Sequence, residues 1–384
     1  MRAAGMICEC NPLHEGHRYL LRQAKENGAD AVICVMSGSF VQRGEAAILD
    51  ARTRAEILCD GGADAVFELP FPYCSSGAEF FARAGVDVLS RLGVSELWFG
   101  SECGDVERLD RLAAIVSGEA FQAAYAGSVR SEEGTAARYV SLLQSMEKSD
   151  EPILPNDLLG IAYLRALKEG ATTMRPFTVK RMGSGYAEET VCADQYPSAT
   201  ALRLLLKQGN LDEARRYLTD TCHRLLAETI ANGDAPAEMK NAERLILGFF
   251  RLQPKAYFEE IAELSGGLGA RLCEAARRAR SLEELLSLAA TKKYPRARLQ
   301  RGILFALTGI GQTDMRTSPT YTRLLAANET GHRFLASIRK TAQIPIVTRS
   351  ADYPKTPEAI KQRELEQKAE WLYSLCLPSM IGEQ

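Results

Sequence analysis

The amino terminus reads Ala3-Ala4-Gly5-Met6-Ile7-Cys8 and, after two intervening residues, Asn11-Pro12-Leu13-His14-Glu15-Gly16-His17. The apolar run predicts a buried strand, and the polar run predicts a tight turn followed by the start of a helix. Two histidines three residues apart share one face of a helix, whose first turn adds unpaired N–H groups and a partial positive charge. This arrangement suits a triphosphate. The alternative is an ordinary amphipathic helix with surface or core histidines.

The His14-x-Gly16-His17 pattern at the end of a first strand resembles the signature of the HxGH nucleotidyltransferase and class I synthetase superfamily. The resemblance implies that an α-phosphate is attacked and pyrophosphate leaves, while the two histidines stabilise negative charge on the phosphates. Gly16 has no side chain, so we expect it to let a nucleotide approach the backbone closely.

A second fragment, Ser198-Ala199-Thr200-Ala201-Leu202-Arg203, has the form of the later phosphate motif of that superfamily. We expect Ser198 to cap a helix, the Thr200 hydroxyl to reach a phosphate oxygen, and Arg203 to add a positive charge one turn later. A plain N-capped helix is the alternative, because S-x-T before an apolar run is common. Together the two motifs predict an ATP-using adenylyl-transfer site with the catalytic residues His14, His17, Thr200 and Arg203.

The first two hundred residues alternate between apolar runs and helical patterns, which predicts a Rossmann-like α/β domain with a parallel sheet. The predicted strands are 3–8, 31–36, 65–69, 95–100 and 175–181, and the clearest helices are 51–61 and 77–92. From about Asp212 the pattern is helical almost throughout. We therefore expect a nucleotidyltransferase domain at 1–210 that binds ATP and carries out adenylation, followed by a mostly α-helical C-terminal domain at 211–384.

Composition indicates a cytoplasmic enzyme. The chain has 384 residues, which is more than a single core usually organises, and a net charge of −2. It contains no apolar run long enough to span a membrane and begins directly with a strand, so we expect neither a membrane partner nor a signal peptide. The ten cysteines are scattered, with Cys8 and Cys10 as the only close pair and no C-x-x-C. This favours reduced thiols and no metal ligated by the protein.

One local segment is strongly basic. Residues 291–301 (Thr-Lys-Lys-Tyr-Pro-Arg-Ala-Arg-Leu-Gln-Arg) hold five cations and no acid, with Tyr294 available for stacking. The neighbouring segment 271–280 adds Arg277, Arg278 and Arg280. Attached to an adenylation domain, this run suggests contacts with an RNA backbone. A solvated helix face is the alternative.

Taken together, the motifs resemble the tRNA(Met) cytidine acetate ligase family of bacteria. The matching blocks are distributed over most of the chain: residues 5–20, 37–45, 62–70, 99–102 (Phe-Gly-Ser-Glu), 156–160, Lys180-Arg181 with Gly185-Tyr186, 198–203 and 292–301. The chain departs from the family pattern at Cys10, where an aromatic is expected before Asn-Pro, and in its short tail. The first departure puts one pocket contact in doubt, and neither removes a charged group.

The resemblance implies the residues of both binding sites. ATP is expected at Ile7, Cys8, Glu9, Cys10, Asn11, Pro12, Leu13, His14, Glu15, Gly16, His17, Arg18, Tyr19, Leu20, Gly100, Asn156, Arg181, Met182 and Ser198. The helical domain is expected to bind tRNA through Lys292, Lys293, Tyr294, Arg296, Arg298 and Arg301. For Gly100, Asn156 and Arg181, the alternatives are a turn glycine, a helix N-cap and a surface cation.

The implied reaction acetylates N4 of the wobble cytidine (C34) of elongator tRNA(Met). Acetate and ATP would form an acetyl-adenylate, with AMP and diphosphate released and Mg²⁺ held through the ATP phosphates; no protein partner is expected. Two other functions remain open: an HxGH adenylyltransferase with a mononucleotide-type acceptor, and a non-catalytic RNA-binding protein on this fold. The general base for the cytosine amine and the roles of Glu9 and of the 37–45 loop also stay open, while His223 and His332 are expected to be structural.

Overall fold

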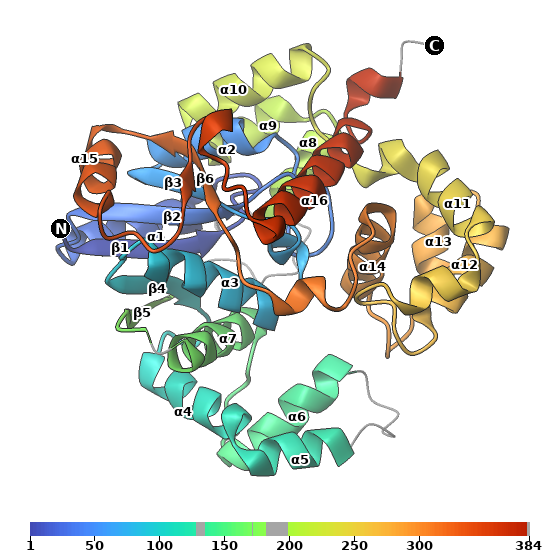
Figure 1. Cartoon of the computed structure of the whole chain (residues 1–384), viewed down its shortest axis with the longest axis horizontal. Helices are drawn as coiled ribbons and strands as arrows, with labels where there is room; N and C mark the ends of the chain where they lie inside the picture. Colours follow the sequence, from blue (N-terminus) through green and yellow to red (C-terminus); the bar gives the residue numbers. More distant parts are fainter. Residues whose placement is uncertain (128–134, 171, 182–198, 382–384) are drawn as a thin grey trace.

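The computed structural model describes residues 1–127, 135–170, 172–181 and 199–381. Within these ranges a seven-stranded sheet has the order β5-β4-β1-β2-β3-β6-β7 (Figure 1). The strands are β1 (Ala3–Cys8), β2 (Ala31–Ser37), β3 (Ala65–Leu69), β4 (Glu96–Ser101), β5 (Arg175–Lys180), β6 (Thr322–Ala327) and β7 (Ile346–Val347). The first five are parallel and agree with the five predicted strands to within one residue at each end, so the α/β class is confirmed.

Both faces of this sheet are covered by helices, which explains why β1, β2 and β3 are apolar runs. One face packs on α3 (Ala78–Arg91), α4 (Val106–Ser117) and α7 (Pro155–Glu169). The other packs on α1 (Glu15–Glu26) and α2 (Ala51–Asp60). The strand β1 lies between β2 and β4, so the chain runs outward from it in both directions. Such a switch point leaves a crevice at the carboxyl ends of the two central strands, here β1 and β4.

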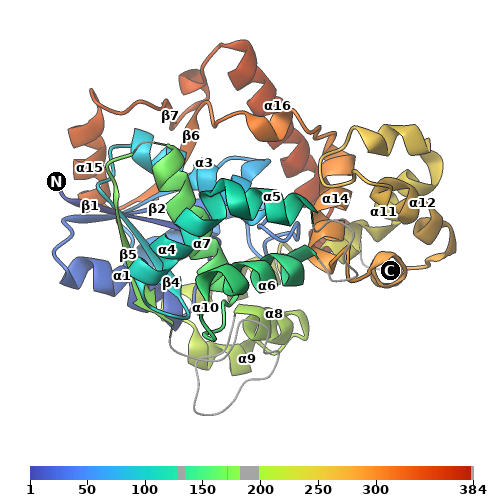
Figure 2. The ribbon, with the colours of Figure 1, turned by 90° about the horizontal axis from the view of Figure 1, so that it is seen from below.

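The remaining helices surround this core. They are α5 (Glu119–Gly127), α6 (Thr135–Glu147), α8 (Ala199–Lys207), α9 (Leu211–Ala214), α10 (Asp220–Ala231), α11 (Glu243–Leu252), α12 (Leu268–Arg278), α13 (Leu282–Ala289), α14 (Arg296–Thr308), α15 (Glu329–Ile338) and α16 (Pro357–Ser374). Figures 1 and 2 both place α11–α14 together at one side of the sheet, with α15 at the opposite side. No helix within the described ranges is long and apolar enough to cross a bilayer.

The expectation of helices almost throughout after Asp212 is wrong at β6 and β7. The strand β6 pairs antiparallel with β3, and β7 pairs with β6. The β6 sequence, Thr-Arg-Leu-Leu-Ala-Ala, holds good helix formers, but the edge of β3 offers unpaired backbone groups that a strand satisfies. The Thr322 hydroxyl also donates to the Glu68 carbonyl at 2.7 Å. The second half of the chain therefore completes the sheet of the first, and the boundary near residue 210 stays a prediction.

Candidate nucleotide site

A cavity opens at the carboxyl ends of β1 and β4, where the strand order predicts the ligand crevice. Of the residues predicted from the sequence, it is lined by Ile7, Cys8, Glu9, Cys10, Asn11, His14, His17, Leu20, Gly100, Asn156, Arg181, Thr200 and Arg203. Six others lie beside it without lining it: Pro12, Leu13, Glu15, Gly16, Arg18 and Tyr19. Met182 and Ser198 fall outside the described residues.

The two histidines are fixed by the helix start itself. His14 is the N-cap of α1, where its Nδ1 accepts from the Gly16 N–H at 3.0 Å, and the His17 Nδ1 accepts from the His14 N–H at 3.4 Å. The ring centroids are 3.9 Å apart. Because each Nδ1 is an acceptor, these hydrogen bonds assign the proton of each neutral ring to Nε2. Burial lowers the pKa of His14 well below its usual value and that of His17 to about 4, so the free rings are uncharged N–H donors.

Gly16 packs against the ring of its neighbour His14. A Cβ at this position would lie 2.9 Å from Cε1 of His14, closer than real side chains allow. The absence of a side chain at Gly16 therefore makes room for the capping imidazole, while close approach of a nucleotide to this backbone stays a prediction.

Arg203 joins the two predicted motifs across 192 positions of the sequence. Its Nη1 donates to the Asn11 carbonyl at 2.9 Å, and its Nη2 donates to the Thr200 Oγ1 at 3.1 Å. Both residues of this later motif sit on α8, whose first turn faces the cavity. The guanidinium and the Thr200 hydroxyl thus stand beside the turn that carries the histidines.

Asn11 lines the same cavity and carries a buried donor. Its side chain is 2% exposed, and its Oδ1 accepts from the Ile48 N–H at 2.9 Å. Among the described residues its Nδ2 finds no acceptor. A buried donor without a partner costs about 1–3 kcal/mol.

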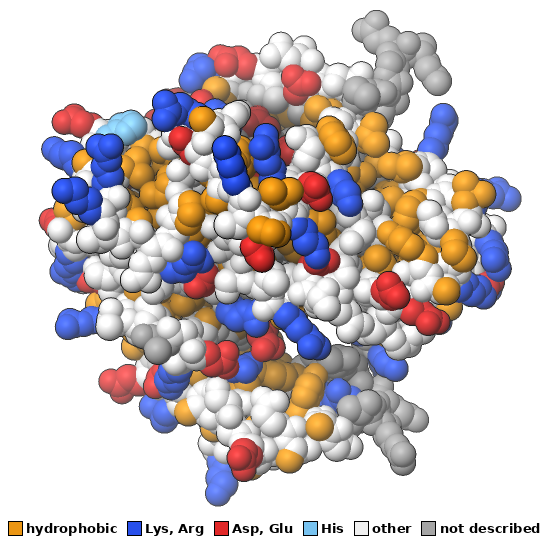
Figure 3. All heavy atoms as spheres, viewed as in Figure 1, with side chains coloured by type: hydrophobic (Ala, Val, Ile, Leu, Met, Phe, Trp, Pro, Cys, Tyr) orange, Lys and Arg blue, Asp and Glu red, His pale blue; other side chains and the backbone are white. Residues whose placement is uncertain are grey.

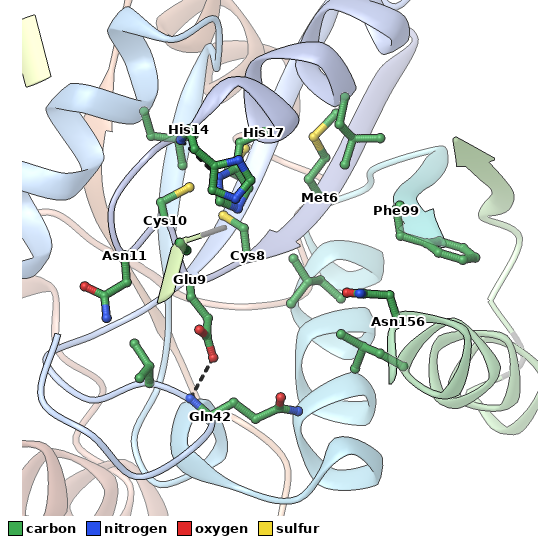
Figure 4. A pocket seen from close by; sticks show the side chains of 18 of the residues that line it. Met6, Cys8, Glu9, Cys10, Asn11, His14, His17, Gln42, Phe99 and Asn156 are labelled. Carbon is green, nitrogen blue, oxygen red and sulfur yellow. Dashed lines mark hydrogen bonds between the residues drawn. The ribbon is translucent and has the colours of Figure 1, made fainter. Parts of the chain in front are cut away.

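Asn156 is held by a carboxylate that sequence reasoning quoted but gave no role. The N-cap of α7 is Leu154, so the N-cap alternative for Asn156 is wrong. Its Nδ2 donates to Oε1 of Glu102 at 2.6 Å, and Oε2 of Glu102 accepts from the Asp157 N–H at 2.9 Å. Glu102 follows β4 directly, so it ties the first turn of α7 to the strand end beside Gly100. The side chain of Asn156 points into the cavity in Figure 4.

A buried arginine that sequence reasoning missed organises the strand ends. Arg54 on α2 is 1% exposed. It donates to the carbonyls of Glu9 at 2.6 Å, of Leu49 and Ser37 at 3.0 Å each, and of Gly38. No local pattern could reveal it, because its acceptors come from three separate stretches of chain.

The 37–45 loop contributes side chains both to the protein core and to the wall of the cavity. Phe40 and Val41 are buried, and Val41 also lines the cavity together with Gln42, Arg43 and Glu45. The Gln42 N–H donates to Oε1 of Glu9 at 2.9 Å, the contact dashed in Figure 4. Burial raises the pKa of Glu9, and this hydrogen bond opposes the rise.

The carboxyl end of the basic segment 291–301 lies next to this loop. A Cβ at Gly44, whose φ is +76°, would lie 2.5 Å from the Arg301 N, so loop and α14 backbones are in direct contact. The Gln300 Nε2 also donates to Oε1 of Glu45 at 3.0 Å. The predicted tRNA contacts thus start one loop away from the cavity.

Several of the predicted tRNA contacts are engaged within the protein. Oε1 of Glu263 lies 2.8 Å from the Arg301 Nε, and its Oε2 lies 3.5 Å from the Arg298 Nε. Arg296 pairs with Glu283 at 2.5 Å. Three other members of the segment are Lys292 and Lys293, which are exposed, and Tyr294, which is half-buried. On the face of the molecule in Figure 3, basic and acidic side chains are interspersed.

Comparison with known proteins gives one family. A sequence model of the HIGH nucleotidyl transferase family matches residues 1–384. The tRNA(Met) cytidine acetate ligase of Syntrophotalea carbinolica is 35% identical, covering 100% of this chain and 96% of the relative. That of Caldicellulosiruptor saccharolyticus is 34% identical, covering 98% and 94%.

Two solved structures agree with this result. The apo crystal structure of Thermotoga maritima TmcAL matches with a TM-score of 0.92 and 31% identity, covering 98% of this chain and 95% of that one. The structure of the same protein bound with alpha-thio ATP matches with a TM-score of 0.88 and 30% identity, covering 100% and 97%. This chain therefore belongs to the tRNA(Met) cytidine acetate ligase family of HIGH nucleotidyl transferases.

Proposed function

We propose that this ligase uses ATP and acetate to acetylate N4 of the wobble cytidine (C34) of elongator tRNA(Met). The observation that carries the proposal is the meeting of the two phosphate motifs, in which Arg203 bonds both Thr200 and the Asn11 carbonyl beside His14 and His17. The nucleotide analogue bound by Thermotoga maritima TmcAL supports ATP as the nucleotide.

In the first step an acetate oxygen attacks the α-phosphorus of ATP. A new P–O bond forms, the bond to the β-phosphate oxygen breaks, and diphosphate leaves. The Nε2–H groups of His14 and His17, the Thr200 hydroxyl and the Arg203 guanidinium are the donors available to the charge that builds on the phosphate oxygens. The unpartnered Nδ2 of Asn11 is a further donor at the same wall.

We expect Mg²⁺ to enter with the triphosphate. Within the described ranges, no group of three or more His, Cys, Asp and Glu side chains is arranged to hold a metal ion. Protein ligands alone therefore do not define its position. When bound, the ion would neutralise phosphate charge.

In the second step the cytosine N4 amine attacks the acetyl carbonyl: a C–N bond forms, the bond from the acetyl carbon to the phosphate oxygen breaks, AMP leaves, and one N4 proton is released. The acetate must be activated first, because a free carboxylate is a very poor acyl donor and the N4 lone pair is shared with the ring. A base in a single-stranded anticodon loop leaves its stack at low cost.

The test is ATP consumption by the purified chain in the presence of acetate and tRNA(Met), followed by mass spectrometry of the tRNA nucleosides. The proposal requires acetylated cytidine at position 34 only when ATP and acetate are both present. Diphosphate release without this product would indicate another adenylyl acceptor. RNA binding without turnover would indicate the non-catalytic alternative.

A further inference from the structure

Three thiols line the nucleotide cavity, and the function above uses none of them for chemistry. Cys8 ends β1 and is half-buried, whereas Cys10 and Cys34 are buried. Figure 4 shows the sulfur atoms of Cys8 and Cys10 directed into the same space below the rings of His14 and His17. We call Cys8, Cys10 and Cys34 the thiol cluster.

The cluster makes Cys8 unlike Cys59 and Cys103, the other half-buried cysteines among the described residues. Hydrogen bonds from the thiols of Cys10 and Cys34 lower the pKa of Cys8 well below its usual value against the opposing effect of burial. Burial instead raises the pKa of Cys59, to about 11, and that of Cys103. Thiolates, not thiols, react with oxidants, so Cys8 has the environment of a reactive cysteine.

The backbone decides which neighbour can form a disulfide with Cys8. In the β1–β2 register Cys34 pairs with Met6, so it lies two residues along and one strand across from Cys8. These offsets give a Cα separation of about 8 Å, beyond the roughly 7 Å that a disulfide bridges. Two residues of one chain span at most about 7 Å, so Cys10 lies within reach of Cys8.

We propose that the thiol cluster is a modification site for peroxides, at which Cys8 is oxidised and then forms a disulfide with Cys10. In the first step the Cys8 sulfur attacks the peroxide: an S–O bond forms, the O–O bond breaks, and the leaving oxygen departs as alcohol or water after protonation. In the second step the Cys10 sulfur attacks the Cys8 sulfenic acid: an S–S bond forms, the S–O bond breaks, and water leaves with the Cys10 proton.

The disulfide would sit in the turn between β1 and the histidines. Bridging residues two apart restrains the backbone that carries Asn11 and His14, so the oxidised protein should bind ATP more weakly. A strained bridge is also reduced easily, so a thiol reductant should restore binding. This consequence for ATP rests on the proposed function, but the oxidation chemistry does not.

Trypsin separates the possible products. Cleavage after Arg2, Arg18, Lys25 and Arg43 places Cys8 and Cys10 on the peptide 3–18 and Cys34 on the peptide 26–43. The reduced full-length protein is treated with hydrogen peroxide, its remaining thiols are alkylated, and its peptides are weighed. We expect peptide 3–18 to lose two hydrogen atoms and to escape alkylation at concentrations about tenfold below those that oxidise Cys103.

The Cys10→Ser variant should stop at the Cys8 sulfenic acid, which dimedone traps on the same peptide. ATP affinity, measured by calorimetry before oxidation, after it and after dithiothreitol, should fall and then recover. Oxidation of Cys8 no faster than of Cys103, or a link between peptides 3–18 and 26–43, would overturn the proposal. Unchanged ATP affinity despite a complete disulfide would overturn its effect on the site, whereas absence of ATP binding by the reduced protein would count against the proposed function instead.

Discussion

At the scale of single residues, the spacing of His14 and His17 sets their chemistry. The Nδ1 of each ring accepts a hydrogen bond from a backbone N–H at the start of α1, so its Nε2–H is the group left for the cavity. Burial keeps both rings neutral, so they donate hydrogen bonds without adding charge of their own. The arginines that line the cavity are Arg43, Arg181 and Arg203, and they supply its full positive charges. In the proposed reaction the pair would orient phosphate oxygens while the arginines would compensate their charge.

Removing one ring should stop both steps of the reaction. We expect His17→Ala to lower ATP- and acetate-dependent diphosphate release about 10²–10³-fold, since a positioned donor to the transition state is lost. Binding of tRNA, measured by filter retention, should be unchanged. The matched control is His332→Ala, because His332 is exposed on α15. Full activity in the His17 variant would remove the central assignment.

Burial of His17 also predicts a pH dependence of stability. The pKa is about 4 in the folded protein and about 6.5 in an unfolded chain, so between these values the unfolded chain binds more protons. The stabilisation is present above pH 6.5 and is lost as the pH falls. We expect His17 to account for about 1–2 kcal/mol of the loss in unfolding free energy between pH 7 and pH 5. Urea titrations of wild type and His17→Gln at the two pH values measure this, and equal losses would contradict it.

The residue scale also shows what a sequence can reveal of a site. The histidine spacing predicted a helix start with both rings on one face, because capping is local. Some contacts of the site join residues far apart in the sequence: Arg54 donates to the Glu9 carbonyl, Glu102 accepts from the Asp157 N–H, and Cys34 interacts with Cys8. No local sequence pattern encodes such contacts. The sequence around Thr200 predicted a phosphate motif. The hydrogen bond from Arg203 of that motif to the Asn11 carbonyl could not be predicted, because it depends on the fold.

At the scale of elements, α2 holds the ends of β1 and β2 in register through Arg54. Its guanidinium donates hydrogen bonds to four backbone carbonyls near the ends of these strands. We expect Arg54→Met to lower the free energy of unfolding by about 3–5 kcal/mol, because several buried acceptors lose their donor. Urea unfolding measures this, with Arg52→Met as the control, since Arg52 is exposed on the same helix. A loss as small as that of the control would refute the role of Arg54.

The contact between β4 and α7 predicts a specific kinetic effect. Glu102 accepts from Asn156 and from the Asp157 N–H, and Glu102→Gln keeps the shape but offers one acceptor oxygen instead of two. We expect the KM for ATP to rise about tenfold while kcat changes little. The Asn156 side-chain amide is still present in this variant, but it is no longer held in its orientation. Glu107→Gln, on the exposed face of α4, is the control. A fall in kcat at unchanged KM would contradict a positioning role.

Element types were predictable where burial alone decides them. The strands β1, β2 and β3 are covered on both faces, so their sequences are continuous apolar runs that no helix pattern imitates. The strand β6 lies at the edge of the parallel part and is only half-buried, and its Leu and Ala residues fit a helix equally well. Its state is set by pairing with β3, more than 250 positions earlier in the chain, which no sequence window contains.

At the scale of the whole molecule, the chain folds back so that its second half surrounds the site of the first. The helix α14 touches the 37–45 loop at Gly44, and α16 reaches the same region through Tyr373, whose hydroxyl donates to the Ala47 carbonyl at 3.0 Å. The loop that lines the cavity is thus clamped by two helices from the end of the chain.

This arrangement decides how the proposed tRNA surface is tested. Reversing the charges of Arg298 and Arg301 would break their ion pairs with Glu263, so a loss of activity would not separate folding from tRNA binding. Lys292 and Lys293 are exposed at the start of the same segment, and reversing their charges leaves those ion pairs intact. Substituting these two lysines therefore tests tRNA binding without disturbing the ion pairs of Glu263.

We expect the double variant Lys292→Glu, Lys293→Glu to raise the KM for tRNA at least about tenfold and to make tRNA binding less dependent on salt, because fewer phosphate contacts release counterions. Acetyl-adenylate formation without tRNA, read as diphosphate release, should continue at the wild-type rate. The matched control reverses Arg339 and Lys340, an adjacent exposed pair at the end of α15, on the opposite side of the sheet from α14 (Figure 1). If both double variants bind tRNA equally well, the basic segment is only a solvated helix face. If adenylate formation by the Lys292, Lys293 variant fails as well, the basic segment supports the nucleotide site itself, and the proposal that one half of the chain binds tRNA while the other forms the adenylate is wrong.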